Sequence, residues 1–259
     1  DPSGMDPSTQ LARIGTRVRE MIKDQYRCYT QDIEPRLAVE GICRILPGDL
    51  TPAQKEHLSK VFDSDLLPIL TPIAASGPAP FPLLANRAIH LCVRLSGKDE
   101  KGQDVSRFAI VPVGKKLGRF IALPGDGGFR FVLIEDLVAL FIHRFFAGQT
   151  VEECTQFRIT RNADMAVRED LAADLLSQME EVLDERNRSD CVSLEVGQGS
   201  GKETIGFLQQ ALEIGSEMVF QVGGPLDLSS YSALCDLRGF ERLRFESWPP
   251  QPCLRSEPG

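Results

Sequence analysis

Apolar residues follow a helical period at the start of the chain and a strand period over much of the remainder. From residue 11 to residue 29 they recur at steps of three and four, which predicts an amphipathic helix. The inward positions of this helix are Leu11, Ile14, Val18, Met21, Ile22, Gln25 and Tyr29. Ser8 can cap its start, Pro35 interrupts it and Gly41 ends it. Because one amphipathic helix lacks helical neighbours here, we expect it to protrude or to dock loosely.

A second helix is predicted from residue 51 to about residue 67. Thr51 is a suitable cap, and Pro52 occupies the first helical position, where proline is tolerated. Four prolines then fall within residues 72–82 and exclude further helix, because proline fixes its own backbone and extends the residue before it.

From residue 88 onward the period changes to two, and predicted strands and helices alternate. The strands are predicted at 88–95, 105–113, 129–134, 151–160, 191–196 and 218–221, and the helices at 135–146, 169–188 and 202–212. This order predicts an α+β fold, a mixed α/β domain with a mixed sheet and flanking helices. Phe141, Phe145 and Phe146 either fill the core side of their helix or form an interface patch.

Composition and charge exclude some classes of function. The net charge is −8, which argues against nucleic-acid binding because such proteins carry a basic face. No apolar run reaches the length of about 18 residues that a membrane helix needs. The seven cysteines form no CxxC pair and are odd in number, which favours reduced thiols and a cytoplasmic location.

The sequence offers no catalytic cluster of its own. The three histidines, His57, His90 and His143, fall in three different elements without a metal ligand at a suitable spacing. We therefore interpret them as surface or half-buried structural residues. The adjacent carboxylates Glu152 and Glu153 are interpreted as solvated surface charge, like the pair at 180–181.

A glycine-rich segment, GQGSGK at 197–202, looks like a phosphate-binding loop between a strand and a helix. A P-loop needs an earlier glycine where this chain has Val196, and a hydroxyl for Mg²⁺ where it has Glu203. The segment is therefore predicted to be a flexible turn that binds neither ATP nor polyphosphate tightly.

Four short runs together resemble a known family. They read LPILTPI at 67–73, PFPLLAN at 80–86, FRITRNAD at 157–164 and GGPLDL at 223–228. In this order they are similar to runs of polyphosphate kinase, the long bacterial enzyme that moves the terminal phosphate of ATP onto inorganic polyphosphate. FRITRNAD is the most specific of them, whereas Ala79 departs from the family's usual histidine. The resemblance spans about residues 11–236.

The resemblance also implies a division of the chain. Residues 1–41 would be the end of an all-helical N-terminal domain, residues 42–246 the middle (head) domain, and residues 247–259 a linker toward absent catalytic domains. The family's phosphate-accepting histidine, Mg²⁺-binding arginines and most of its ATP pocket belong to those absent domains. The implied function is therefore a non-catalytic scaffold and dimerisation portion of a phosphotransferase.

No catalytic, cofactor-binding or metal-binding residue is carried over from the family. ATP and Mg²⁺ are expected for the parent enzyme, and none is expected to be bound by this segment. The expected partners are the missing N- and C-terminal domains and other copies of the parent, as a dimer or tetramer. ATP and polyphosphate are its substrates, and nucleic acid is not a partner. The parent is expected to be cytoplasmic, with peripheral membrane association as an option.

Five residues are candidates for contacts between domains or subunits: Thr160, Arg161, Asn162, Asp164 and Phe81. Arg161 could clamp a carboxylate or phosphate in a bidentate manner, or could pair locally while Asn162 or Asp164 caps the next helix. Phe81 could dock a partner domain, or could fill the core beneath a rigid proline-rich crossover.

Two further functions compete with the scaffold. One is a self-standing α/β protein-interaction module without enzymatic activity, which would descend from such an enzyme. The other is a small independent phosphotransferase, which the lack of a recognisable nucleophile argues against.

Overall fold

Two β-sheets organise the chain up to Leu226. The computed structural model describes residues 4–75, 81–98, 104–114, 118–125, 127–162, 190–246 and 248–249. It divides into two units, Asp1–Leu226 and Asp227–Gly259, and the sheets belong to the first. In the second unit, 3₁₀ turns span Leu228–Asp236 and Glu241–Leu243.

The larger sheet contains six strands within the described residues, in the order β2-β4-β3-β7-β8-β9. Their bounds are β2 Ile73–Ala74, β3 Ile89–Lys98, β4 Asp104–Pro112, β7 Thr150–Arg161, β8 Cys191–Gly197 and β9 Val219–Val222. Neighbouring strands run antiparallel except β8 and β9, which are parallel. The sheet is therefore mixed, as the alternation of predicted strands and helices indicated.

The smaller sheet has the order β1-β6-β5. Its strands are β1 Ile42–Arg44, β5 Phe120–Ala122 and β6 Phe129–Leu133. β1 runs parallel to β6, and β5 runs antiparallel to it. The sequence pattern predicted only β6 of these three, because three-residue strands are too short to display a period of two.

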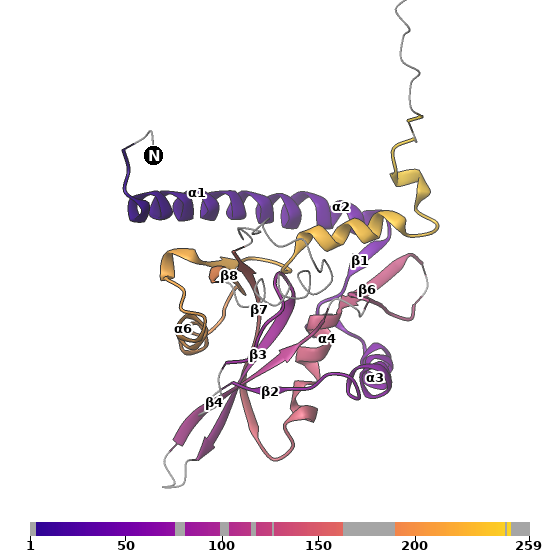
Figure 1. Cartoon of the computed structure of the whole chain (residues 1–259). Helices are drawn as coiled ribbons and strands as arrows, with labels where there is room; N and C mark the ends of the chain where they lie inside the picture. Colours follow the sequence, from indigo (N-terminus) through magenta and orange to yellow (C-terminus); the bar gives the residue numbers. More distant parts are fainter. Residues whose placement is uncertain are drawn as a thin grey trace, which may run out of the picture. The chain divides into compact units, whose positions relative to one another are not determined.

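The predicted first helix ends before Gly41, as expected, but Pro35 does not interrupt it. Helix α1, Pro7–Cys28, continues through a π turn at Tyr29–Ile33 into α2, Glu34–Val39, and Figure 1 shows them as one rod. Its cap is Asp6 rather than Ser8, because the Asp6 carboxylate accepts a hydrogen bond from the N–H of Thr9. These hydrogen bonds, together with those from the Ser8 and Thr9 hydroxyls, lower the pKa of Asp6.

The other described helices begin close to their predicted starts. They are α3 Pro52–Val61, α4 Ile134–Leu140 and α6 Lys202–Ala211. Thr51 caps α3 in a complete capping box with Gln54, as its position before Pro52 indicated. Helix α4 is shorter than predicted and passes into a 3₁₀ turn at Ile142–Phe145. The predicted helix at 169–188 lies outside the described residues.

Successive residues of each strand face opposite sides of the larger sheet, and each side has its own core. One side packs against α6, with Phe157, Ile159 and Leu208 among its buried residues. The other side packs against α3 and α4, with Phe62, Leu91 and Leu137 buried. Figure 1 shows α6 apart from α3 and α4 across the strands. The mixed α/β fold class is thereby confirmed.

Helix α1 docks against the β9 edge of the larger sheet, so of the two expectations, protrusion or loose docking, protrusion is wrong. Arg19 donates hydrogen bonds to the carbonyls of Ser216 and Glu217, at 3.3 and 2.7 Å, and lies over the Phe220 ring. A side chain at Gly15 would put its Cβ 2.7 Å from the Glu217 carbonyl oxygen, so the close approach requires glycine.

The docked face of α1 agrees only in part with the face that the apolar pattern suggested. Val18 and Ile22 are half-buried and Tyr29 is buried, as expected, whereas Leu11, Ile14 and Met21 are exposed. The pattern missed Gly15 and Tyr26, the buried residues of α1, because neither counts as a strongly apolar position.

Candidate functional site

Two of the four family-like runs meet at the end of β7. The backbone N–H of Arg161 donates to Asn86 Oδ1 at 3.0 Å, and the N–H of Arg87 donates to the Ile159 carbonyl at 2.9 Å. Arg87 has φ of 57°, a left-handed conformation that these contacts hold in place. The PFPLLAN run therefore anchors the FRITRNAD run from the neighbouring segment.

The contact candidates lie at this junction, as far as the structure describes them. Thr160 and Arg161 are half-buried, and Asn162 is exposed with its N–H bonded to the Asp190 carbonyl at 2.9 Å. Asp164 lies outside the described residues, so the cap on the following helix is untested. Contacts of these residues with another domain or subunit stay a prediction.

Phe81 packs inside the described fold. Its ring lies 6.1 Å from that of Phe207 on α6, and Phe207 stacks on Phe108 at 4.0 Å. This arrangement favours the interpretation of Phe81 as a filler beneath the proline-rich crossover. The phenylalanines after α4 behave similarly, because Phe141 and Phe145 pack on buried Phe62 at 5.4 and 5.5 Å.

The glycine loop is closed by a carboxylate of the protein itself. Glu153 accepts hydrogen bonds from the N–H of Gly201 at 2.7 Å and from the hydroxyls of Thr204 and Thr155 at 2.6 Å each. Burial opposes the charge of Glu153, but these bonds and Arg94 outweigh it and lower its pKa. Glu153 thus takes the place that a phosphate would have at the start of α6.

This contact corrects the interpretation of Glu152 and Glu153 as a pair of solvated charges. Glu152 is exposed, whereas the Glu153 side chain is only 18% exposed and turned toward α6. The alternation of side chains along a strand could have indicated that one of these two glutamates is buried. Adjacent residues of a strand point to opposite faces of the sheet, so both cannot face solvent when one face is covered.

The GGPLDL run forms one wall of a cleft on the other face of the larger sheet. Tyr26 donates from its hydroxyl to the Pro225 carbonyl at 2.7 Å, and a Cβ on Gly224 would come within 2.9 Å of the Tyr26 ring. The first helix therefore rests directly on this run, and glycine is needed for the approach.

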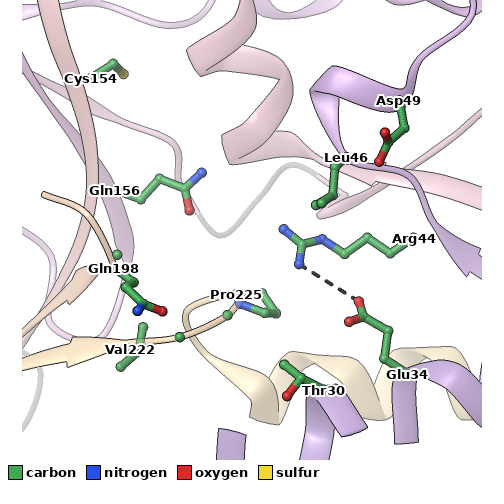
Figure 2. A pocket seen from close by; sticks show the side chains of 13 residues that line it. Thr30, Glu34, Arg44, Leu46, Asp49, Cys154, Gln156, Gln198, Val222 and Pro225 are labelled. Carbon is green, nitrogen blue, oxygen red and sulfur yellow. Dashed lines mark ion pairs between the residues drawn. The ribbon is translucent and has the colours of Figure 1, made fainter. Parts of the chain in front are cut away.

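The cleft has a volume of about 590 Å³. Thr30 and Glu34 line it from the helical rod, and Arg44, Leu46 and Asp49 from β1 and the turn after it. From the larger sheet, the lining residues are Cys154, Gln156, Gly197, Gln198 and Val222, followed by Gly223, Gly224 and Pro225. Figure 2 shows Arg44 and Gln156 extending toward each other from opposite walls.

A network of charged and polar side chains joins the walls of this cleft. Arg44 Nη2 donates to Asp136 at 2.9 Å, and its Nη1 lies 4.0 Å from Glu34, the ion pair dashed in Figure 2. Gln156 Nε2 donates to the same Asp136 carboxylate at 2.7 Å, and the Tyr29 hydroxyl donates to Glu34 at 2.9 Å. The network connects the helical rod, β1, α4 and β7.

A second buried pair lies next to this network. Arg119 Nε donates to Glu135 at 3.0 Å, and Arg119 Nη2 also bonds to the carbonyl of Leu226 in the GGPLDL run. The Glu135 side chain has no exposed surface. Burial raises the pKa of Glu135 even though the hydrogen bonds and charge of Arg119 act in the opposite direction.

Sequence reasoning did not find these four charged residues, Arg44, Arg119, Glu135 and Asp136. The only indication of them in the sequence is the acidic pair Glu135 and Asp136, which opens an apolar helix directly after a buried strand. Arg44 and Asp136 are 92 positions apart, so their pairing follows from the tertiary fold.

The histidines remain separate in the structure. His57 is half-buried and His143 exposed, while His90 is 1% exposed and its ring packs in a tilted arrangement on that of Phe157, with the ring centroids 5.4 Å apart. His90 is thus more deeply buried than predicted, and burial lowers its pKa to about 4. Over the described residues, no group of three or more His, Cys, Asp or Glu side chains could hold a metal ion. In the same part of the chain, no helix is long and apolar enough to cross a membrane.

Comparison with known proteins decides the family. The polyphosphate kinase middle domain matches residues 53–234. The chain belongs to the polyphosphate kinase family. This agrees with the positions of the four runs, which fall within or close to the matched region.

Polyphosphate kinases are also its curated relatives. The Bacillus cereus polyphosphate kinase is 37% identical over 96% of this chain, which covers 36% of that protein. The Rhodopirellula baltica polyphosphate kinase is 31% identical over the whole chain, covering 38% of the relative. The chain thus spans little more than a third of the length of these relatives.

A solved structure has the same fold. The crystal structure of polyphosphate kinase from Porphyromonas gingivalis superposes with a TM-score of 0.70 at 20% identity. The match covers 95% of this chain and 35% of that one. The arrangement of helices and sheets described above is therefore the fold of one part of that polyphosphate kinase.

Proposed function

We propose that this chain is the non-catalytic scaffold and dimerisation portion of a polyphosphate kinase. In that enzyme the terminal phosphate of ATP passes to inorganic polyphosphate through a phosphohistidine outside this chain. ATP and Mg²⁺ bind to the other domains, and the enzyme acts in the cytoplasm as a dimer or tetramer.

The use of the family-like runs supports this proposal most directly. Asn86 and Arg161 join two of the runs at the end of β7, and the GGPLDL run receives bonds from Tyr26 and Arg119. Three of the four runs thus make contacts that connect elements of the fold. Phosphoryl transfer needs positioned cations and, in this family, a histidine nucleophile. The three separate histidines of this chain offer no such arrangement.

Substitution of Arg161 in a longer polyphosphate kinase that contains this chain tests the scaffold role. If Arg161 holds domains together, Arg161→Ala should lower activity and dimer stability together. Sedimentation velocity measures the dimer, and phosphate transfer from labelled ATP measures the activity. The control is Arg17→Ala, because Arg17 is exposed on α1 and its ion pair, with Glu20 three positions later, is exposed as well.

A purely local role for Arg161 gives a different result. A capping or local pairing role predicts a stability loss of about 1 kcal/mol with unchanged dimerisation. Unchanged dimerisation of the Arg161→Ala variant would contradict the proposed contact. A longer kinase that stays monomeric at every concentration measured would contradict it as well.

A further inference from the structure

Two aromatic side chains near the end of the described residues face water. Phe245 is 102% exposed and Trp248 is 91% exposed, whereas every other phenylalanine or tyrosine of the chain is buried or half-buried. Leu243, two positions before Phe245, is 42% exposed. Folding normally buries side chains of this size, and exposed groups of them mark contact surfaces. We call Leu243, Phe245 and Trp248 the C-terminal anchor.

The backbone before the anchor is fixed by its own hydrogen bonds. The N–H of Leu243 donates to the Phe240 carbonyl at 2.9 Å, and the N–H of Arg244 donates to the Glu241 carbonyl at 3.1 Å. Arg244 Nη2 also donates to the Leu237 carbonyl at 3.2 Å. A turn held in this way loses little conformational freedom when it binds, which favours docking.

The anchor offers apolar surface rather than charge. Arg244 and Glu246, which flank Phe245, carry opposite charges, so they give no preference for an acidic or a basic partner. Pro249 favours an extended backbone at Trp248 and so limits the positions of the indole. The fitting partner is therefore an apolar pocket that accepts aromatic rings.

The size of the anchor decides between two kinds of partner. A buried aromatic side chain covers about 150–250 Å². Three side chains therefore supply less than about 800 Å², the area that each partner contributes to a stable interface. A free second copy would bind weakly through the anchor alone. A pocket on the same polypeptide needs less area, because the covalent connection gives it a high effective concentration.

We propose that the C-terminal anchor docks into an apolar pocket on the part of the kinase polypeptide that lies outside this chain. The chain spans little more than a third of the length of its relatives, so a longer kinase has further surface to provide the pocket. The inference rests on the proposed function, because it gives the scaffold one of its contacts, and it concerns residues other than the junction at Arg161.

Fluorescence of Trp248 tests the proposal, because Trp248 is the only tryptophan of this chain. In the chain alone, acrylamide should quench its emission strongly at every protein concentration. In a longer polyphosphate kinase that contains this chain, subtraction of the Trp248→Phe spectrum isolates the same emission. We expect it to lie at shorter wavelength there and to be quenched several-fold less, because docking removes the indole from water.

Variants separate the aromatic contact from the rest of the segment. Phe245→Ser should lower the unfolding temperature of the longer kinase by several degrees. The same change should leave the chain alone unaffected, because a fully exposed side chain has no contact to lose. Glu246→Ser is the matched control, since Glu246 is exposed and lies between the two aromatic residues. It should leave both proteins unchanged.

Three outcomes would overturn the proposal. Equal quenching of Trp248 in the chain alone and in the longer kinase would show that the indole stays in water. Protection that appears in the chain alone as its concentration rises would make a second copy the partner. Equal shifts for Phe245→Ser and Glu246→Ser in the longer kinase would show that the aromatic side chain is not what docks.

These results are separate from those of the Arg161→Ala variant. A protected Trp248 together with an intact Arg161→Ala dimer would support the anchor and refute the scaffold contact at Arg161. An exposed Trp248 together with a weakened Arg161→Ala dimer would refute the anchor alone.

Discussion

Neighbouring residues of β7 point to opposite faces of the larger sheet, and their polar groups meet different surroundings. On the α6 face, Glu153 is surrounded by donors from Gly201, Thr204 and Thr155, and the start of the helix is filled. On the other face, Gln156 donates to Asp136 and lines a cleft of about 590 Å³. The end of the glycine-rich loop is satisfied internally by Glu153, whereas the start of the same loop, at Gly197 and Gln198, lines the open cleft together with part of the GGPLDL run.

The largest expected effect concerns the face that carries the cleft. Arg119→Ala leaves Glu135 buried without its cation, which should lower the free energy of unfolding by about 3–5 kcal/mol at pH 7. The loss should shrink as the pH falls, because protonation of Glu135 removes the buried charge and its pKa is already raised. Urea denaturation at pH 7 and pH 5 measures both effects. An equal loss at the two pH values would contradict this account of the pair.

His90 provides the next effect, on the α6 face. Its pKa is lowered to about 4 in the folded protein, so the unfolded chain binds the proton more readily. The contribution of this group to the free energy of unfolding is fully present above the unfolded pKa of about 6.5. About 3 kcal/mol of it is lost as the pH falls toward 4. His90→Gln should remove this part of the acid sensitivity. Parallel stability curves for the two proteins between pH 7 and pH 4 would show that His90 does not contribute.

Glu153 tests whether the start of α6 depends on its internal carboxylate. Glu153→Ala should cost about 2 kcal/mol, because it leaves the N–H of Gly201 and two buried hydroxyls without their acceptor. Folding lowers the pKa of Glu153, so this contribution should be fully present at pH values above the usual pKa of a glutamate. It should fade as the pH falls below that pKa. Glu152→Ala is the matched control, and thermal unfolding is the measurement. Equal losses in the two variants would mean that the contact contributes little.

The smallest expected effect is at Lys202. The loop lacks the glycine and the hydroxyl of a P-loop, and Glu153 holds its helix start. Lys202→Ala should therefore leave the nucleotide binding of this chain unchanged, as measured by equilibrium dialysis with labelled ATP. A measurable affinity that disappears in this variant would show that the loop binds phosphate.

Local patterns predicted much of the fold. The cap at Thr51, the strands β3, β4, β7 and β8 and the start of α6 depend on a few adjacent residues, and they were predicted close to their observed positions. The short strands β1 and β5 were missed, because three residues give no reliable period. The docked face of α1 was predicted only in part, because some of its contacts depend on small size at Gly15 and on hydrogen bonding by Tyr26.

The cleft could not be predicted in the same way. Its network pairs Arg44 with Asp136 and places Glu34 beside them, and no short segment contains more than one of these residues. Charged residues in a single sequence are normally interpreted as solvated, and only the fold shows which of them are buried together. The family resemblance identified the chain, but its contact candidates include none of the residues that line the cleft, although Gly223, Gly224 and Pro225 of the GGPLDL run are among them.

One assay tests the central claim that this chain belongs to a polyphosphate kinase without carrying its chemistry. The purified chain is incubated with labelled ATP and Mg²⁺, and acid-labile phosphoprotein and polymer are measured. Phosphoryl transfer needs an in-line nucleophile and cations around the moving phosphate, and the three histidines lie in separate elements. We predict that neither product forms. A phosphohistidine at His57, His90 or His143 that passes its phosphate into polyphosphate would contradict the account.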